Sequence, residues 1–333
     1  MIWKGQKEYE KAKECYLRAL QLSETAYEKR STPMLQRDIS LALSALGELC
    51  RLRSDHAAAL EYFHKAEHIQ YFILYESRSL RAMRELASTY HQISRCHQEQ
   101  EDLESAITYL KSSVRHSQEA LRESCNARQD LEDLENTLSK LEEIYTQRED
   151  YAAALDCAKE LCDVTRHLFY QSKTPAQYQR VVKRCYRVMM YAEKCDKVTR
   201  ELAEEYYVMA LDFAYECLES YADKTVLHFG IVCGAKLAIF LEKKGHKKAA
   251  AFIYLRTLYF TKYMTEDFSS PNDWKNLNIA ATHLHALRSL MREKGNLELA
   301  CDSFRCLLRH FTEDSAYPAL LADMEQRLAE RSR

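Results

Sequence analysis

Polar side chains that could recognise a ligand recur at fixed intervals along this sequence. Arg37 and Arg84 lie 47 residues apart, and His91 and His285 occupy corresponding positions in their own segments. Arginine and histidine supply hydrogen-bond donors of defined geometry, so their recurrence predicts a surface that follows an extended ligand. Solvated surface residues would give the same pattern at any single position. The other candidates near these four are Ser44, Glu48, Arg51, Arg95, Ser139, Glu143, Ser289 and Arg292.

A second candidate site is suggested by uneven charge in the middle of the chain. Residues 129–163 include 11 acidic and 3 basic side chains, whereas residues 173–200 include 8 basic and 2 acidic ones. These neighbouring segments could neutralise each other between adjacent parts of the fold. Alternatively, the second segment could carry a basic patch that contacts an acidic peptide, a phosphate group or a nucleic-acid backbone. The candidate basic patch consists of Arg180, Lys183, Arg184 and Arg187.

Three tyrosines are interleaved with that basic patch, namely Tyr178, Tyr186 and Tyr191. Aromatic rings beside basic side chains permit stacking on nucleic-acid bases. Aromatic residues at helical spacing are, however, more often part of a protein core. The tyrosines therefore leave both interpretations open.

Sequence patterns for catalysis or for metal binding are weak. The sequence contains no HExxH, no GxSxG and no Gly-rich phosphate loop. His64 and His68 have the i, i+4 spacing of two ligands to one metal, but no third ligand is evident nearby. We therefore expect no enzymatic activity, no metal and no cofactor.

The overall charge provides no general attraction for nucleic acid or for a membrane surface. The chain has 48 basic and 50 acidic residues, for a formal net charge of -2. A near-neutral protein binds polyanions only through a local patch. We therefore expect a protein or peptide as the partner, rather than nucleic acid or a membrane.

Cysteines and apolar segments favour a soluble helical protein of the cytoplasm. The twelve cysteines are scattered through apolar positions without a CxxC pair, which is typical of reduced packing residues. The N-terminal residues lack the apolar region of a signal peptide. The most hydrophobic segment, 225–241, contains His228 and Lys236, so we expect a buried helix there and no membrane span.

The elements that position these residues form a repeat. Seven alanines recur at intervals of 47 to 50 residues, each in a similar local pattern. A fixed period of this length indicates stacked supersecondary units. With only 6 glycines and 4 prolines in 333 residues, the helices must be long and the turns few. The alanines are Ala12, Ala59, Ala106, Ala154, Ala203, Ala250 and Ala300.

Each unit is predicted to contain two antiparallel helices. Apolar and small residues around the repeat alanines fall three or four apart, on one face of a helix. Another helix precedes most of them, separated by a short polar break such as 53–55, 99–101 or 244–246. Pro33 and Pro175 each follow a threonine, a pair that favours a helix start. Each unit is therefore a helical hairpin.

This pattern resembles the tetratricopeptide repeat. The consensus has Leu-Gly-x-x-Tyr in its first helix and Gly-x-Tyr-x-x-Ala-x-x-x-Tyr-x-x-Ala in its second, and residues 43–66, 9–20 and 295–304 are similar to it. The period of about 48 exceeds the family's usual 34, which predicts longer helices. The helix expected at 175–194 fits the consensus poorly.

The resemblance implies an all-α, right-handed superhelical solenoid of antiparallel helix pairs that occupies residues 1–333 as one domain. Its first helices would line a concave face, on which the recurring polar residues would contact the partner. The expected units are an incomplete unit at 1–30, six units at 31–77, 78–124, 125–172, 173–221, 222–268 and 269–316, and a C-terminal capping helix at 317–333.

The first unit lacks a partner for its helix at 5–30. An amphipathic helix with an uncovered packing face is unfavourable. We therefore expect that another part of a longer protein, or a second copy of the chain in a homo-oligomer, covers it.

These observations favour a non-catalytic scaffold or sensor that recognises a protein segment or peptide, as part of a larger signalling protein. The alternative is a solenoid that binds nucleic acid or phosphate through the basic helix at 180–187.

Overall fold

The computed structural model of this chain is entirely α-helical over the residues that it describes. These are residues 2–125, 127–221 and 223–246, with the single positions 250, 253, 257, 260, 322, 326, 329 and 330. The chain forms two compact units, 1–164 and 165–333, each of which is described by itself. Within each unit, helices that follow one another along the chain pack as antiparallel pairs, which confirms the predicted all-α repeat of helical hairpins over the described residues.

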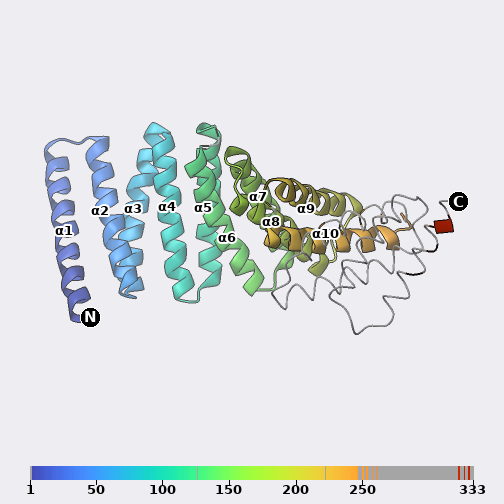
Figure 1. Cartoon of the computed structure of the whole chain (residues 1–333). Coiled ribbons are helices and arrows are strands. Elements are labelled where there is room, and N and C mark those ends of the chain that lie inside the picture. Colours follow the sequence, from blue (N-terminus) through green and yellow to red (C-terminus); the bar gives the residue numbers. More distant parts are fainter. Residues whose placement is uncertain are drawn as a thin grey trace. The chain divides into compact units, whose positions relative to one another are not determined.

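The first unit contains six complete helices that lie side by side in chain order (Figure 1). They are α1 (Ile2–Lys29), α2 (Pro33–Leu52), α3 (His56–Ser77), α4 (Leu80–Glu99), α5 (Leu103–Glu123) and α6 (Arg128–Gln147). The next helix, α7 (Tyr151–Gln171), contains the boundary between the units, which coincides with none of the predicted repeat boundaries. The second unit continues with α8 (Pro175–Lys194), α9 (Arg200–Ser220) and α10 (Lys224–Lys243).

Helix lengths alternate with the repeat. The first helix of each pair (α2, α4, α6, α8 and α10) has 20 residues, and the second helix (α3, α5, α7 and α9) has 21 or 22. Twenty residues span about 30 Å at 1.5 Å per residue. The prediction of long helices is confirmed for this part of the chain, including the helix at 175–194.

The repeat alanines are helix contacts in the core. All five that lie between Ala59 and Ala250 have no exposed surface, and Ala12 of α1 is half-buried. Phe63 of α3 and Tyr207 of α9, four residues after their alanines, are 0% and 2% exposed. A small residue beside a large one lets two helices approach closely while the gap is filled.

A close approach of this kind fixes the pair α2 and α3. A Cβ added to Gly47 would lie 2.8 to 3.0 Å from three ring carbons of Phe63. Since heavy atoms do not pack that tightly, only glycine fits between the helices at this point. The small residue in the Leu-Gly pattern is thereby explained by packing.

The turns inside the helix pairs repeat as well. Ser54, Glu101 and Glu149 have φ values of 61°, 63° and 57°, in the left-handed region. Each precedes an aspartate whose side chain accepts a hydrogen bond from a backbone N–H in the first turn of the next helix, as Asp55 does from Ala58 at 3.2 Å. The left-handed residue ends one helix and the aspartate caps the next.

Proline and threonine begin two of the first helices as the sequence predicts. Thr32 and Thr174 are N-caps whose hydroxyl groups accept hydrogen bonds from Leu35 N and Gln177 N, and Pro33 and Pro175 follow them. Proline is tolerated there because its missing N–H has no partner within the helix. The prolines at 271 and 318 lie outside the described residues.

Helix α10 is the apolar helix of the second unit. Among the described helices it is the one long and apolar enough, by length and composition, to cross a membrane. More than half of it is buried, and it packs against α8 and α9. A core helix of a helical stack has the same composition, so this is weak evidence for a membrane span.

The ten cysteines in the described part of the chain are free thiols, and seven of them are buried. Burial raises the pKa of Cys96 to about 11 and that of Cys157 to about 12. These thiols stay protonated and serve as small apolar packing groups, in line with the sequence-based interpretation.

Candidate functional site

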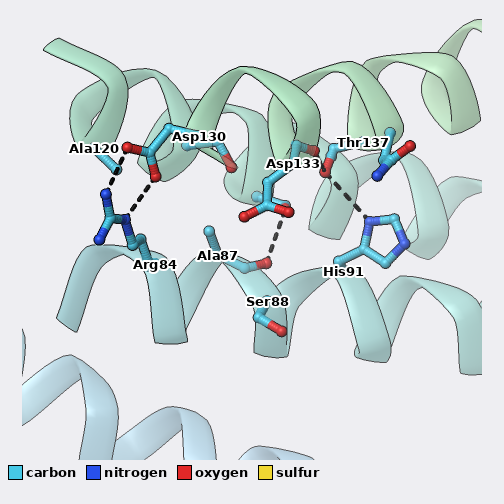
Figure 2. Close-up of a pocket in the computed structure, with 11 residues that line it drawn as sticks. Arg84, Ala87, Ser88, His91, Ala120, Asp130, Asp133 and Thr137 are labelled. Carbon is cyan, nitrogen blue, oxygen red and sulfur yellow. Dashed lines mark hydrogen bonds and ion pairs between the residues drawn. The ribbon is translucent and has the colours of Figure 1, made fainter. Parts of the chain in front are cut away.

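The candidate site lies where polar side chains of α4 and α6 face each other (Figure 2). Arg84 and His91 of α4 point towards Asp130 and Thr137 of α6. Each facing pair is 46 residues apart, because both helices are first helices of successive pairs. Residues seven apart lie on the same side of a helix, so the two contacts line one strip.

One end of the strip is closed by an ion pair. Arg84 Nε and Nη2 donate hydrogen bonds to Asp130 Oδ1 and Oδ2 at 2.6 and 2.7 Å. The Asp130 side chain is 2% exposed and that of Arg84 is 39% exposed. The guanidinium of Arg84 holds the pKa of Asp130 below its usual value. Both groups stay charged, and the two parallel hydrogen bonds fix their geometry.

A cavity of about 220 Å³ opens between α4, α5 and α6. Helix α5 contributes Ser113, whose hydroxyl donates a hydrogen bond to the carbonyl oxygen of Ala87 at 2.8 Å. Most lining groups are small and polar, and there is no large apolar side chain among them. The lining residues are Arg84, Ala87, Ser88, His91, Ser113, Ser117, Ala120, Asp130, Asp133, Asn136 and Thr137.

Asp133 is the carboxylate of this cavity that has no cationic partner in the described part of the chain. It remains exposed and accepts one hydrogen bond, from Gln129 Nε2 at 2.9 Å. Partial burial raises the pKa of Asp133 and the neighbouring charge of Asp130 adds to the rise, whereas the hydrogen bond from Gln129 and the more distant positive charge of Arg84 oppose it. At neutral pH Asp133 is a negative charge that no cationic side chain bonds to among the described residues, and Arg84 acts on it only through its more distant charge.

His91 stands at the other end of the cavity. Its Nδ1 lies 3.4 Å from the Thr137 hydroxyl oxygen, which itself donates to the carbonyl oxygen of Asp133 at 3.0 Å. Burial, reinforced by the positive charges of Arg95 and Lys140, lowers the pKa of His91 to about 4. The imidazole is therefore neutral at physiological pH and adds no positive charge.

Most of the arginines that were predicted to lie on the concave face connect successive first helices. Arg37 Nε of α2 donates to Glu85 Oε1 of α4 at 2.6 Å, and this contact corresponds to that of Arg84 one repeat later. Arg51 of α2 bonds to Glu48 at 2.7 Å and to Glu99 of α4, and its side chain is only 7% exposed. The recurrence of arginine along the sequence therefore reflects, in these helices, ion pairs between repeats.

The other residues that were predicted for the concave face have longer contacts or contacts within their own helix. Arg95 Nη1 lies 3.8 Å from Glu48 and 3.0 Å from Gln92. Ser44 donates to the carbonyl oxygen of Ser40 at 3.0 Å. Glu143 is exposed and pairs with Lys140 at 2.9 Å, and Ser139 is half-buried. His285, Ser289 and Arg292 lie outside the described residues.

The predicted basic patch lies on α8, in the second unit. Arg180 and Lys183 are exposed, and Arg184 and Arg187 are half-buried. Arg187 donates to the hydroxyl of Tyr191 at 3.0 Å. Tyr178 and Tyr191 are buried, so two of the three tyrosines beside the patch are core residues.

Four residues of the site were not predicted from the sequence, namely Asp130, Asp133, Ser88 and Thr137. A usable signal exists, because an arginine of one first helix meets an acid 46 to 48 residues later. The described residues contain no group of three or more His, Cys, Asp or Glu side chains that could hold a metal ion.

Comparisons with known proteins give a fold likeness alone. No family model matches the sequence, and no curated protein matches it. The S. pombe nuclear import adaptor Nro1 is 10% identical, with a TM-score of 0.47, over 88% of this chain and 99% of that chain. The quorum sensor NprR from B. thuringiensis is 15% identical, with a TM-score of 0.32, over 97% and 86%.

A third solved structure is the C-terminal part of a TPR repeat-containing protein from Cytophaga hutchinsonii. It is 9% identical, with a TM-score of 0.34, over 96% of this chain and 99% of that chain. At these identities the likeness concerns the helical-repeat fold and extends no further.

Proposed function

We propose that this chain is a non-catalytic binding module that recognises a protein segment or peptide on the first-helix wall, the surface formed by α2, α4 and α6. The observation that carries the proposal is the polar cavity on this wall, between α4, α5 and α6. This cavity contains a carboxylate, Asp133, that has no cationic partner among the described residues. Arg37, Arg51 and Arg84 of the same wall form ion pairs with carboxylates of the next first helix.

The protonation states favour binding over catalysis. A general acid or base works best when its pKa lies near the working pH. His91, with a pKa of about 4, is a poor proton acceptor from a reacting group, and Asp130 is held by Arg84. Ser113 donates its proton to a backbone carbonyl, and in the described part of the chain no hydrogen bond joins its hydroxyl to a side-chain base.

The ion pairs between successive first helices support recognition of an extended ligand. Arg37, Arg51 and Arg84 each connect one first helix to the next, which fixes the spacing of the side chains between them. A surface that is ordered before binding loses less conformational entropy when the ligand arrives. Repeats of equal spacing present such a surface to a chain segment.

The test is selection of a random peptide library on the folded full chain, followed by affinity measurement on two variants. Ser88→Trp places a large side chain at an exposed cavity position of α4, and Thr108→Trp places the same side chain at an exposed position of α5 outside the cavity. We expect Ser88→Trp to weaken binding by roughly tenfold or more and Thr108→Trp to leave it unchanged. Equal affinities, or no selected peptide, would contradict the proposal.

The alternative, anion binding by the basic patch on α8, is favoured by one observation. Lys183 Nζ lies 5.8 Å from the ring centre of Phe229, and Lys236 Nζ lies 5.6 Å from that of Tyr186, so two ammonium groups flank neighbouring rings of α8 and α10. Lys236 is also paired with Glu193, which reduces the local positive charge. A steep salt dependence of oligonucleotide binding, lost in Lys183→Gln, would support this alternative.

A further inference from the structure

We propose that the cavity between α4, α5 and α6 binds a cationic side chain, the ammonium of a lysine or the guanidinium of an arginine, with Asp133 as its counter-ion. The proposal deepens the function proposed above and rests on it, since the cation would belong to the bound segment. It assigns a chemical class of ligand to one place on the first-helix wall.

The charges that line the cavity leave a net negative charge. Arg84 and Asp130 neutralise each other through two hydrogen bonds. His91 is neutral at physiological pH, because its pKa is about 4. Asp133 alone remains, with a single hydrogen bond from a neutral amide. A cation entering the cavity would meet one uncompensated carboxylate, whereas an anion would be repelled by it.

Charged side chains of α4 and α6 outside the lining are paired with opposite charges. Arg95 lies 3.8 Å from Glu48, a carboxylate that it shares with Arg51, and Lys140 lies 2.9 Å from Glu143. Glu132, which precedes Asp133, is paired with Arg128 at 2.8 Å. The surroundings of the cavity are therefore close to neutral, and its own charge decides which ligand it accepts.

In the preceding repeat, the carboxylate at the corresponding position has an arginine partner. Glu85 is the sixth residue of α4, and Arg37, the fifth residue of α2, bonds to it at 2.6 Å. Asp133 is likewise the sixth residue of α6, but Arg84, the fifth residue of α4, bonds to Asp130 instead. Asp130 is one turn nearer the start of α6. This shift leaves Asp133 without the arginine that its counterpart has.

The cavity also has the acceptors and the size for one side chain. An ammonium group has three donors, and the cavity that Asp133 lines is also lined by Ser88, Thr137 and Asn136, whose side-chain oxygens are acceptors. Ala87 and Ala120 provide apolar surface for the methylene groups of the entering side chain. A volume of about 220 Å³ is below the roughly 300–1,000 Å³ of sites for drug-sized ligands.

The direct test uses a small probe, Nα-acetyl-L-lysine N-methylamide, titrated into the full chain and followed by the backbone amide NMR signals of α4 and α6. The matched neutral probe is the same compound acetylated on its side-chain nitrogen. We expect the charged probe to shift these signals and to bind roughly tenfold more tightly than the neutral one. Equal shifts with both probes, or none at the highest soluble concentration, would overturn the proposal.

Two variants locate the interaction. Asp133→Asn removes the charge and keeps the shape, and it should abolish the preference for the charged probe. Glu132→Gln removes the same charge from the adjacent residue, which does not line the cavity, and should preserve the preference. Circular dichroism checks that both variants are folded, which we expect because Asp133 makes no ion pair in the described structure. A preference that survives Asp133→Asn refutes the assignment.

The outcome also separates this inference from the proposed function. If selected peptides bind the first-helix wall but the lysine probe does not bind, the cation site is wrong and the binding function stands. If the probe binds in an Asp133-dependent way but no peptide is selected, the cation site stands and peptide recognition is wrong.

Discussion

The pair formed by Arg84 and Asp130 should be worth far more than an ordinary surface ion pair. We predict that Arg84→Gln destabilises the protein strongly, because it leaves the carboxylate of Asp130, which is 2% exposed, without its charged partner. The same change at Arg81, whose side chain is 66% exposed and 3.3 Å from Glu85, serves as the control on the same helix.

The magnitude follows from the exposure of the two groups. Breaking a fully buried ion pair costs about 3–5 kcal/mol, whereas an exposed pair contributes about 0.2–1 kcal/mol. Asp130 belongs to the first class, but Arg84 is 39% exposed, so water partly screens the interaction. We therefore expect Arg84→Gln to lower the free energy of unfolding by about 2 kcal/mol. Arg81→Gln should lower it by less than about 0.5 kcal/mol.

The assay is a double-mutant cycle with Arg84→Gln and Asp130→Asn, measured by urea denaturation of the full chain and followed by far-ultraviolet circular dichroism. We expect a coupling energy of about 1.5–2 kcal/mol between the two sites. Hydrogen exchange should show that the loss of protection is concentrated in α4 and α6, because repeats interact mainly with their neighbours.

The pH dependence provides a second check with a definite sign. Since the folded-state pKa of Asp130 lies below its usual value of 3.8, the pair stabilises the fold above that value. This stabilisation is lost as the pH falls through the folded-state pKa. The stability difference between the natural protein and Arg84→Gln should therefore narrow in acid. A coupling energy below about 0.5 kcal/mol, or a difference that does not change with pH, would refute the reasoning.

Three further predictions concern packing, a turn and a titrating group. Gly47→Ala should lower the free energy of unfolding by about 1–2 kcal/mol, because the new methyl group would clash with Phe63. Thermal unfolding measures this. An unchanged midpoint temperature would contradict the prediction, because it would mean that α2 and α3 can move apart at no cost in free energy. Glu149→Gly should stabilise by about 0.5 kcal/mol because φ is 57° there, whereas Glu149→Ala, which keeps the Cβ, should give no such gain. The pKa of His91 is lowered from 6.5 to about 4, so protonation of this residue disfavours the folded state. The natural protein should therefore lose stability relative to His91→Gln as the pH falls from 6.5 to 4. Chemical denaturation measures this, and a free-energy difference between the two proteins that stays constant over this interval would contradict it.

Much of the fold could be predicted from the sequence because its signals are local. Thr32 followed by Pro33 marks the start of α2, and the polar break at 53–55 marks the turn before α3. Capping and turn geometry depend on a few adjacent residues, which the sequence shows directly. The repeat alanines could likewise be recognised as helix contacts, because a residue's place on a helix face follows from its spacing.

The candidate site could be predicted only in part. Arg84 and His91 were expected on a binding wall, and the structure places both in the lining of the cavity. Their partners Asp130 and Thr137 come from another helix 46 residues later. The repeated positions of Arg37 and Arg84 suggested ligand contacts, whereas in the structure both arginines bond to carboxylates of the next first helix.

The sequence by itself determined the period, the helix pairs, their caps and their packing faces, since these depend on spacing within a few turns of one helix. The tertiary structure decided which carboxylate each arginine meets. Arg84 is bonded to Asp130 and not to Asp133, one turn further along α6, because the packing of α4, α5 and α6 sets the offset between the helices. Because of that offset of one turn, Asp133 forms no ion pair with Arg84. The spacing of residues within a single helix does not contain this information, because the offset is a relation between two helices.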